Sequence, residues 1–239
     1  MKSIAILQSS YIPWKGYFDI INMVDEFVLF DDVQFTRRDW RTRNRIKTKQ
    51  GTQWLTIPVH VKGAYHQRIR DVVAVDDKWR RVHWKSMRHS YSRAAHFGLY
   101  ADAFEELYLG SGERRLTSIN FSFLVALCKM LGIHTPLTYS WDYQLQSERS
   151  LRLASICEQA GATHYLSGPA AKAYLNEQVF AERQIEIEYM DYTGYPEYAE
   201  SFPPFLHEVS VVDLLFNHGP DASRFMKSFH RDNTNREGR

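Results

Sequence analysis

Seven basic residues stand against one acid between Thr36 and Lys49, in the segment TRRDWRTRNRIKTK. From residue 41 onward every second residue is basic, giving Arg41, Arg43, Arg45, Lys47 and Lys49. Side chains of a strand point alternately to its two faces, so this spacing predicts a row of cations on one face. Clustered cations repel one another, and a phosphate-bearing ligand is the simplest reason to hold them together.

A solvated edge strand is the alternative explanation, because lysine and arginine on an edge discourage aggregation of sheets. Two neighbouring features favour a ligand site instead. Trp40 lies within the basic run, and the acid pair Asp31-Asp32 lies just upstream. Gln50-Gly51 then predicts a turn into TQWLTIPVHV, whose apolar residues alternate, so we expect a hairpin with one positive face.

The acid pair follows VLF, an apolar run typical of a buried strand. Adjacent aspartates on a continuing strand point to opposite faces, so we expect only one of Asp31 and Asp32 to enter a ligand crevice. That carboxylate is a candidate to hold a metal, an amine or a ribose hydroxyl, or to act in catalysis. The other is expected to pair with an arginine of the hairpin.

A second group of candidates lies at the end of the first apolar run, SIAILQ, and in the loop SSYIPWKG that follows it. Gln8, Tyr11 and Trp14 supply amide, phenol and indole groups at the start of a predicted helix, where free backbone N–H groups favour anions. The loop has neither the Walker pattern nor a GxGxxG fingerprint. An ordinary strand-to-helix turn is the alternative.

A third group is Ser167, Gly168 and Lys172, after the predicted strand THYLS. Pro169 suits the first turn of a helix, Ser167 is a candidate cap, and Lys172 follows about one turn later. A small residue at a helix start with a nearby cation suits a phosphate or a carboxylate. A capped surface helix without a ligand is the alternative.

The chain contains no sequence motif for zinc binding or for covalent catalysis. The ten histidines form no HExxH pattern, and no GxSxG sequence occurs, so we predict no zinc site and no covalent nucleophile. His218 is expected to cap the end of a helix, and a role as a base is the alternative. Cys128 and Cys157 have no partner spacing and are predicted to be core residues in a reducing compartment.

The net charge of +2 conceals an asymmetry along the chain. Residues 1–100 hold 18 basic and 9 acidic residues, whereas residues 101–239 hold 12 and 19. This argues for an anionic ligand bound by the first part of the chain, either a nucleotide or a nucleic acid. No segment reaches the length of a membrane span or a signal peptide, so we expect a soluble cytoplasmic protein.

The order of elements predicts an α/β fold. The first 32 residues read as strand, loop, helix and strand, which is a βαβ unit and implies a parallel, Rossmann-like sheet. The basic hairpin follows, and a helical insertion is expected at about residues 78–132. Leu137–Tyr139, THYLS and IEIEYMDY are further strand candidates. We predict one α/β domain over residues 1–230 and a flexible tail at 231–239.

Helices are predicted between the strand candidates that follow the insertion. Ser147 is a plausible cap for the helix ERSLRLASICEQA, which Gly161 should end. GPAAKAYLNEQVFAERQ is expected to be helical throughout. Near the end, VSVVDLLFNHG and PDASRFMKSF predict two short helices.

Five blocks, in order, resemble the WbqC-like protein family: QSSYIPWKGYFDII, FDDVQF, RTRNRIKT followed by WLTIPV, ATHYLSGPAAKAYL and SVVDLLFNHGP. The resemblance covers the chain from Ile4 to about Phe229. The residues that it carries over as site residues are Gln8, Tyr11, Trp14, Asp31, Asp32, Arg43, Asn44, Arg45, Ser167, Gly168 and Lys172.

The resemblance implies a role in bacterial O-antigen or related surface-glycan biosynthesis, with aminoacyl or acyl transfer, glycyl for example, to a nucleotide-linked amino sugar. Arg43, Arg45 and Lys47 would hold phosphate, Trp14 or Trp40 would stack on a ring, and Asp31 or Asp32 would act on the amine. The donor would be free, ATP-activated or tRNA-borne, with ATP and magnesium as candidate cofactors. A nucleic-acid-binding module and a non-catalytic assembly protein remain the alternatives.

Overall fold

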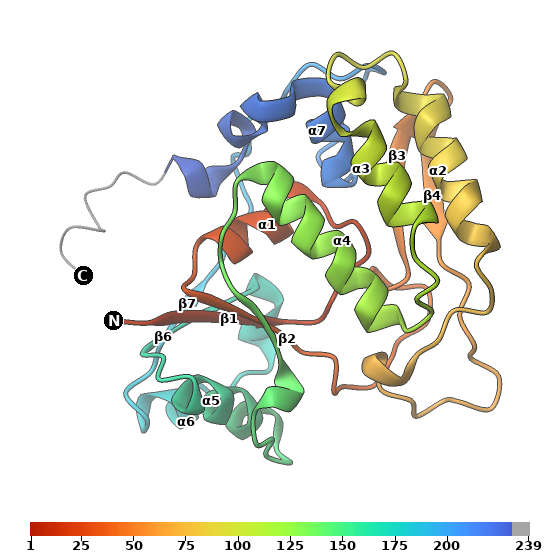
Figure 1. The fold of residues 1–239 in the computed structure, drawn as a ribbon. Helices are drawn as coiled ribbons and strands as arrows, with labels where there is room; N and C mark the ends of the chain where they lie inside the picture. Colours follow the sequence, from red (N-terminus) through yellow and green to blue (C-terminus); the bar gives the residue numbers. More distant parts are fainter. Residues whose placement is uncertain (231–239) are drawn as a thin grey trace.

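A five-stranded, all-parallel sheet forms the centre of the molecule in the computed structural model, which describes residues 1–230 (Figure 1). The predicted tail at 231–239 lies outside the described residues. The spatial order of the strands is β5-β2-β1-β6-β7. Their bounds are β1 Ser3–Leu7, β2 Glu26–Leu29, β5 Leu137–Tyr139, β6 His164–Ser167 and β7 Glu186–Tyr189. The α/β prediction is confirmed.

The predicted βαβ unit opens the chain. β1 pairs in parallel with β2, so that Ile4 lies opposite Glu26 and Leu7 opposite Leu29. Helix α1 (Lys15–Asn22) makes the crossover between them. β1 also pairs with β6 on its other side. Both edges of β1 are therefore used, and β1 lies at the middle of the sheet.

Alternation along β1 and β2 divides the apolar residues between two cores. Ala5 and Phe27 belong to a core shared with α1 and the helix α4 (Leu116–Leu131). Ile4, Ile6 and Val28 belong to a second core beneath α5 (Arg149–Gln159) and α6 (Glu177–Ala181). Successive side chains of a strand face opposite ways, so a strand buried on both faces must be apolar throughout. Helices cover both faces, as Figure 1 shows.

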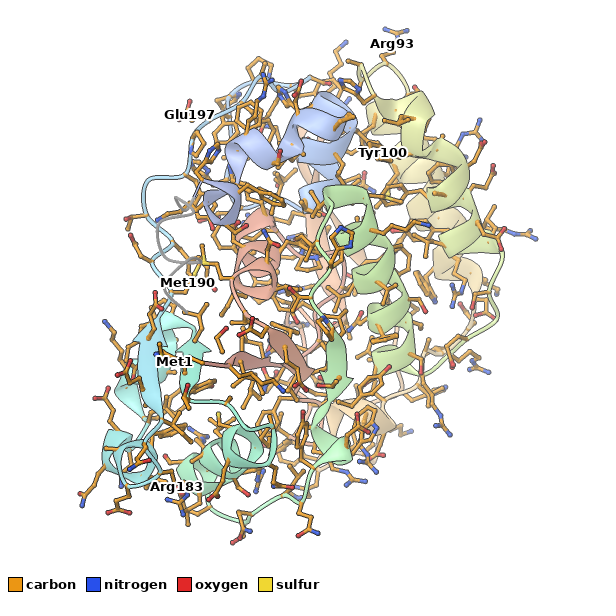
Figure 2. All side chains as sticks on the ribbon, turned by 60° about the vertical axis from the view of Figure 1, so that its left-hand side comes forward. Met1, Arg93, Tyr100, Arg183, Met190 and Glu197 are labelled. Carbon is orange, nitrogen blue, oxygen red and sulfur yellow. The ribbon has the colours of Figure 1, made fainter. Side chains whose placement is uncertain are left out.

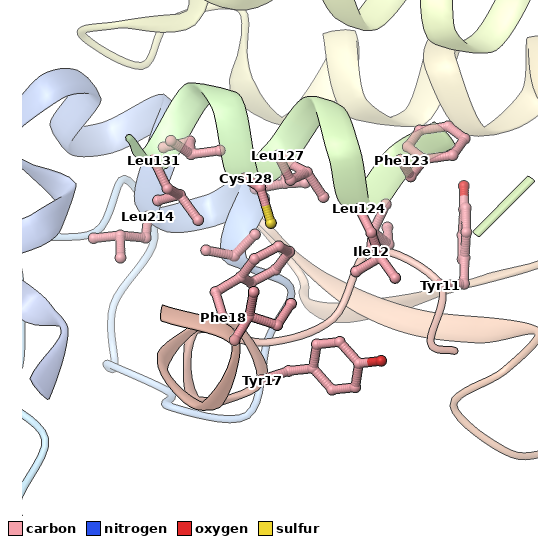
Figure 3. Packing of buried hydrophobic residues seen from close by; sticks show 14 of the residues in the cluster. Tyr11, Ile12, Tyr17, Phe18, Phe123, Leu124, Leu127, Cys128, Leu131 and Leu214 are labelled. Atoms are coloured by element: carbon pink, nitrogen blue, oxygen red, sulfur yellow. The ribbon is translucent and has the colours of Figure 1, made fainter. Parts of the chain in front are cut away.

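Helix α4 packs across α1 and the loop that follows β1 (Figure 3). Phe18 of α1 lies beneath Cys128, and Ile12 of the loop lies beside Leu124. The ring of Tyr11 meets that of Phe123 edge-on, with centroids 5.4 Å apart. The nearly uniform apolar character of α4 is explained by this central position. Cys128 and Cys157 are buried, as predicted.

The basic segment forms the predicted hairpin, separate from the main sheet. Its strands are β3 (Arg43–Thr48) and β4 (Gly51–Thr56). Residues 49–50 make the turn, and Gly51 has φ +114°, a value that favours glycine. The second strand ends at Thr56, sooner than its alternation predicts. Pro58 cannot donate to a ladder, and Val59 pairs instead with Ala74.

The predicted helical insertion is confirmed as three helices, α2 (Lys78–Tyr91), α3 (Phe97–Leu109) and α4. α2 and α3 pack side by side next to the hairpin (Figure 1). Arg93 lies in the turn that joins them, at the outer end of the pair (Figure 2). None of the helices among residues 1–230 is long and apolar enough to cross a bilayer.

A segment without helix or strand, residues 190–210, connects β7 to α7 (Val211–His218). We call it the strap. It runs along the outside of the molecule past Glu197 (Figure 2). Lys15 holds it from beneath, donating to the carbonyl of Pro196 at 3.0 Å and lying over the rings of Tyr195 and Tyr198.

The second half of the chain differs from the sequence prediction at two places, and the remaining elements of the molecule are 3₁₀ turns. α5 is capped by Glu148, whose carboxylate accepts from the N–H of Leu151, and not by Ser147. The segment 168–184, predicted to be one helix, is broken into η3 and α6, because Asn176 caps α6 with its own side chain. The 3₁₀ turns are η1 Ile69–Asp71, η2 Ser140–Asp142, η3 Pro169–Ala173, η4 Gly219–Phe225 and η5 Lys227–Phe229.

Candidate functional site

The order of strands reverses at the carboxyl ends of β1 and β6, and we call this edge of the sheet the crevice, after the place where open α/β sheets bind ligands. The chain leaves β1 toward β2 on one side and returns to β6 on the other, so the loops after β1 and β6 diverge at this point. Ligands of open α/β sheets bind in such a crevice. The loop Gln8–Trp14 and the pair Ser167-Gly168 both lie at this edge, which agrees with their selection from the sequence.

The loop after β1 is fixed by hydrogen bonds to the hairpin segment. The N–H of Tyr11 donates to the carbonyl of Trp40 at 2.9 Å, and the side-chain amide of Asn44 donates to the carbonyl of Tyr11 at 3.2 Å. Asn44 is therefore a buried structural residue. These bonds place the hairpin beside the crevice, although the hairpin is not part of the main sheet.

Two candidates of this loop have different surroundings. Tyr11 is fully buried, and its hydroxyl contacts His83 Nδ1 at 2.9 Å and the Tyr108 hydroxyl at 2.6 Å. Burial lowers the pKa of His83 to about 4. Gln8 is half-buried, and its side-chain amide makes no hydrogen bond to any residue in the range 1–230. The side-chain amide of Gln8 is therefore free to bind a ligand, whereas the Tyr11 hydroxyl is used in contacts with His83 and Tyr108 inside the protein.

Trp14 folds back over the start of α1. A Cβ at Gly16 would lie 2.3 Å from the Trp14 ring, so only glycine leaves room for it. The Trp14 ring also meets Tyr192 and Tyr195 of the strap, at centroid distances of 5.2 and 5.5 Å. An aromatic cluster therefore joins the β1 loop to the strap at this side of the crevice.

Asp31 is completely buried. Its carboxylate accepts from the N–H of Ser9 at 2.9 Å and from the hydroxyl of Thr117 at 2.6 Å. Burial raises the pKa of Asp31, while these hydrogen bonds and the nearby Arg41 oppose the rise. The Asp31 carboxylate therefore has a structural role, because it links the β1 loop to α4 through these two hydrogen bonds.

The Asp32 side chain has different partners from that of Asp31, as expected for consecutive residues, and it is 5% exposed. Its oxygens accept from the Arg70 guanidinium at 2.8 Å and from the Ser140 hydroxyl at 2.8 Å, and Arg68 lies at 3.5 Å. The arginine partners come from η1 and its flank, and the hairpin contributes none. Guanidinium groups against this carboxylate do not fit a magnesium ligand, so no step is assigned to that ion.

The outer face of the hairpin carries two arginines stacked on a tryptophan. The guanidinium groups of Arg43 and Arg45 lie 4.3 and 5.3 Å from the centre of the Trp54 ring. The Trp40 ring lies 5.6 Å from that of Trp54, and the two residues are 43% and 42% exposed. We call Trp40, Arg43, Arg45 and Trp54 the hairpin patch.

The two arginines of the hairpin patch differ in their partners. Arg45 pairs with Glu208 of the strap at 2.7 Å, and Glu208 is itself 79% exposed. Arg43 has no carboxylate partner within residues 1–230. The Nε atom of Arg45 is buried without an acceptor. The guanidinium of Arg43, unpaired and lying over an indole ring, is suited to an anion that also carries an aromatic or sugar ring.

The other cations of the predicted row are placed differently. Lys47 is buried, forms an ion pair with Glu200 at 2.9 Å and donates to the carbonyl of Pro204. Arg41 lies in the turn before β3 and pairs with Asp39 at 2.7 Å. Lys49 lies in the hairpin turn, exposed. The strap covers one end of β3, so the predicted face of five cations is reduced to Arg43 and Arg45 on the exposed strand surface.

The third group of candidates, Ser167, Gly168 and Lys172, does not form the start of an α-helix that could bind an anion. Ser167 ends β6, is buried, and donates to the Tyr165 hydroxyl at 3.3 Å. Gly168 precedes η3, a 3₁₀ turn of five residues whose first residue carries no side-chain cap. Lys172 is exposed, with its Nζ 4.9 Å from the centre of the Tyr189 ring. Only Lys172 of these three offers an accessible charge.

Several residues that the structure brings to the site were missed in the sequence. Trp54 pairs directly with Arg45 across the hairpin, and a turn at residues 49–50 was sufficient to predict that pairing. Arg70 and the strap tyrosines had no such signal, because they approach from distant segments. No group of three or more potential metal ligands occurs among residues 1–230.

Comparisons with known proteins agree with the sequence resemblance. The model of the WbqC-like protein family matches residues 8–225. An uncharacterized protein of Mycobacterium tuberculosis (strain ATCC 25618 / H37Rv), Rv1507c, is 48% identical over 227 residues, which is 95% of this chain and 98% of the relative. No solved structure gave a significant match.

Proposed function

Because this chain belongs to the WbqC-like protein family, we propose that it is an enzyme of bacterial surface-glycan (O-antigen) biosynthesis. In this proposal it attaches an aminoacyl or acyl group to a nucleotide-linked amino sugar, and glycyl is the first group to test. The family membership supplies the glycan context. The hairpin patch supplies the local chemistry for recognising the nucleotide.

The observation that carries the proposal is the stacking of Arg43 and Arg45 on the exposed Trp54. A guanidinium group presents several donors in a plane that matches phosphate oxygens. Exposed indole rings stack on bases or sugars. The hairpin patch therefore combines the two contacts that a nucleotide sugar needs, and it adjoins the β1 loop at the crevice.

Amide formation requires an activated donor, because a free carboxylate has no adequate leaving group. The sugar amine would attack the carbonyl carbon of an acyl adenylate or an ester donor and form the C–N bond. The C–O bond to the carrier would break, and the amine proton would leave with the released carrier or pass to water. Such a reaction needs orientation and charge neutralisation more than a protein nucleophile.

The surroundings of the acid pair favour supporting tasks in this proposal. Asp31 would hold the β1 loop through Ser9, and Asp32 would hold Arg70 at the carboxyl end of β2. A proton acceptor at Asp32 would first have to give up Arg70 and Ser140. Gln8 and Lys172 have groups free for a ligand, whereas Tyr11, Asn44 and Lys47 are committed to structural contacts.

The test is to incubate the purified protein with a nucleotide-linked 4-amino sugar, glycine and ATP. A parallel reaction replaces glycine and ATP with aminoacyl-tRNA, and mass spectrometry follows the sugar. A mass gain of one aminoacyl residue that is lost in Arg43→Gln/Arg45→Gln supports the proposal. No gain with any donor, together with no nucleotide-dependent rise in Tm, would favour a non-catalytic assembly protein.

A further inference from the structure

The outer surface of α2, away from the hairpin patch, carries a second set of cations. Arg81, Lys85 and Arg88 are spaced by four and three residues, so they lie along one face of the helix. All three are exposed, and none forms an ion pair within residues 1–230. By contrast, Arg80 on the buried side of the same helix pairs with Asp77 at 3.5 Å.

These cations border a groove of about 580 Å³ between α2 and α3, next to His89. Its floor includes Trp84 and Leu109. Glu105 is the one acid that lines it, and Glu105 accepts from the Trp84 indole N–H at 3.1 Å. The Trp84 bond is neutral and leaves Glu105 its negative charge, so the three cations outnumber the one acid in the lining and none of them is paired with it.

We propose that this groove binds the phosphate backbone of a nucleic acid. Arg81 and Arg88 are seven residues apart, so the row extends about 10 Å along the helix at 1.5 Å per residue. A nucleic-acid strand presents its phosphates in a continuous row, whereas a single phosphate group occupies one point. Three unpaired cations over the same length match a run of phosphates better than a single phosphate group.

The structure favours this occupant over a membrane surface. An amphipathic helix at a membrane turns its apolar face to the lipid. The apolar residues of α2, including Trp79, Met87 and Tyr91, are buried within the protein. Val82 is the single large apolar side chain that α2 leaves exposed. Leu109 of α3, which lines the groove, is 44% exposed, so the surface offers three cations with two separate apolar side chains and no continuous apolar face.

The proposed groove is independent of the acyl transfer proposed above. Gln53 of β4 donates to Ser86 of α2, which places α2 against one side of the hairpin. Gln53 and Trp54 are consecutive on the strand, so they point to opposite faces. The α2 groove and the hairpin patch are therefore on different sides of the hairpin, and substitutions can separate them.

The experiment measures anisotropy of a labelled random 20-nucleotide RNA over a range of salt concentrations. The variant Arg81→Gln/Lys85→Gln/Arg88→Gln should bind at least tenfold more weakly than wild type at about 0.1 M salt. The slope of log K against log salt should fall by about 2, from three lost contacts at about 0.7 each. Circular dichroism and Tm check that both proteins are folded.

The matched control, Lys62→Gln/Lys129→Gln/Arg149→Gln, removes the same charge from exposed positions elsewhere and should bind within twofold of wild type. Equal losses in both triple variants would overturn the proposal, because net charge alone would then explain binding. No RNA binding by wild type would also overturn it, as would loss in Arg43→Gln/Arg45→Gln alone. Binding of wild type to phosphatidylglycerol vesicles but not to RNA would assign the groove to a membrane instead.

Discussion

Lys47 and Arg43 occupy the same face of β3, four residues apart, yet their charges have different surroundings. The guanidinium of Arg43 lies on Trp54 at the surface, whereas the Lys47 side chain is 3% exposed beside Glu200. A buried cation requires a partner, since moving it out of water costs several kcal/mol. Within the one row, Arg43 is available to a ligand and Lys47 belongs to an internal ion pair.

Glu200→Gln should reduce the free energy of unfolding by about 3 kcal/mol or more, because it leaves Lys47 buried without its counter-charge. Urea denaturation measures the change. Glu208→Gln is the matched control, because Glu208 pairs with Arg45 at the surface and should cost at most about 1 kcal/mol. Similar small losses in both variants would show that Lys47 finds water or another partner.

Trp54→Ala should weaken binding of a nucleoside diphosphate about tenfold, because the ring that supports both arginines is removed. Titration calorimetry gives the Kd. Tyr65→Ala is a suitable comparison, since Tyr65 is an aromatic residue, 78% exposed, outside the hairpin patch. The nucleotide role of the hairpin patch would be rejected if the two variants bound equally well.

At the scale of elements, the strap is held by buried hydroxyl and carboxylate groups. Tyr195 donates to Asp19 of α1 at 2.6 Å, and Tyr198 donates to Asp213 of α7 at 3.0 Å. Asp213 also accepts from Tyr91 of α2 at 2.8 Å. Burial and the nearby Glu200 raise the pKa of Asp213 to about 7. Three elements therefore meet at one carboxyl group that changes its charge near neutral pH.

The stability of the wild type relative to Asp213→Asn should fall as pH rises from about 4 to about 7. A carboxyl whose pKa is raised by folding binds its proton more tightly in the native state, so deprotonation disfavours folding across this range. The contribution is constant above about 7, and its upper bound is about 4 kcal/mol. Urea denaturation at a series of pH values measures it.

The control for this pH dependence is Asp102→Asn, which removes an exposed carboxylate from α3. It should keep the wild-type profile. If Asp213→Asn and the wild type lost stability in parallel between about pH 4 and about pH 7, Asp213 would not be the group responsible for the pH dependence.

At the scale of the molecule, β1 joins the two cores. Ala5 faces α1 and α4, and Ile4 and Ile6 face α5 and α6. Since one strand supplies both cores, loosening one should loosen the other. The single-domain prediction for residues 1–230 can be tested on this basis.

Leu153→Ala, in the core beneath α5, should cost about 2–5 kcal/mol through a cavity. None of the six tryptophans belongs to that core, so their fluorescence reports on the rest of the molecule. We expect the fluorescence and circular dichroism midpoints in urea to shift together. Separate transitions for the two signals would indicate two independently folding units.

Much of the fold could be predicted from local patterns. Alternation predicted the hairpin, apolar runs predicted β1 and β2, and Gly161 with φ +68° ends α5 as expected. These signals depend on neighbours within a few residues. The cap at Glu148 and the break at Asn176 were missed because several nearby side chains compete to satisfy the same backbone groups.

The candidate site could be predicted less completely. The positions of Gln8, Ser167 and the acid pair at strand ends follow from the βαβ pattern, since parallel strands end at one edge of the sheet. The partners of Asp31 and Asp32 do not follow from it. Thr117, Arg70 and Ser140 come from segments 38 to 108 residues away, and no short-range pattern selects them.

Periodicity and long ordered motifs were enough to infer the family, the parallel sheet, the helical insertion and the basic hairpin. Which of the charges are available to a ligand could be seen only in the folded molecule. The strap covers Lys47 while Arg43 stays at the surface, and distant partners occupy both aspartates. Burial and pairing depend on which segments meet in space, and charge spacing along a chain does not contain that information.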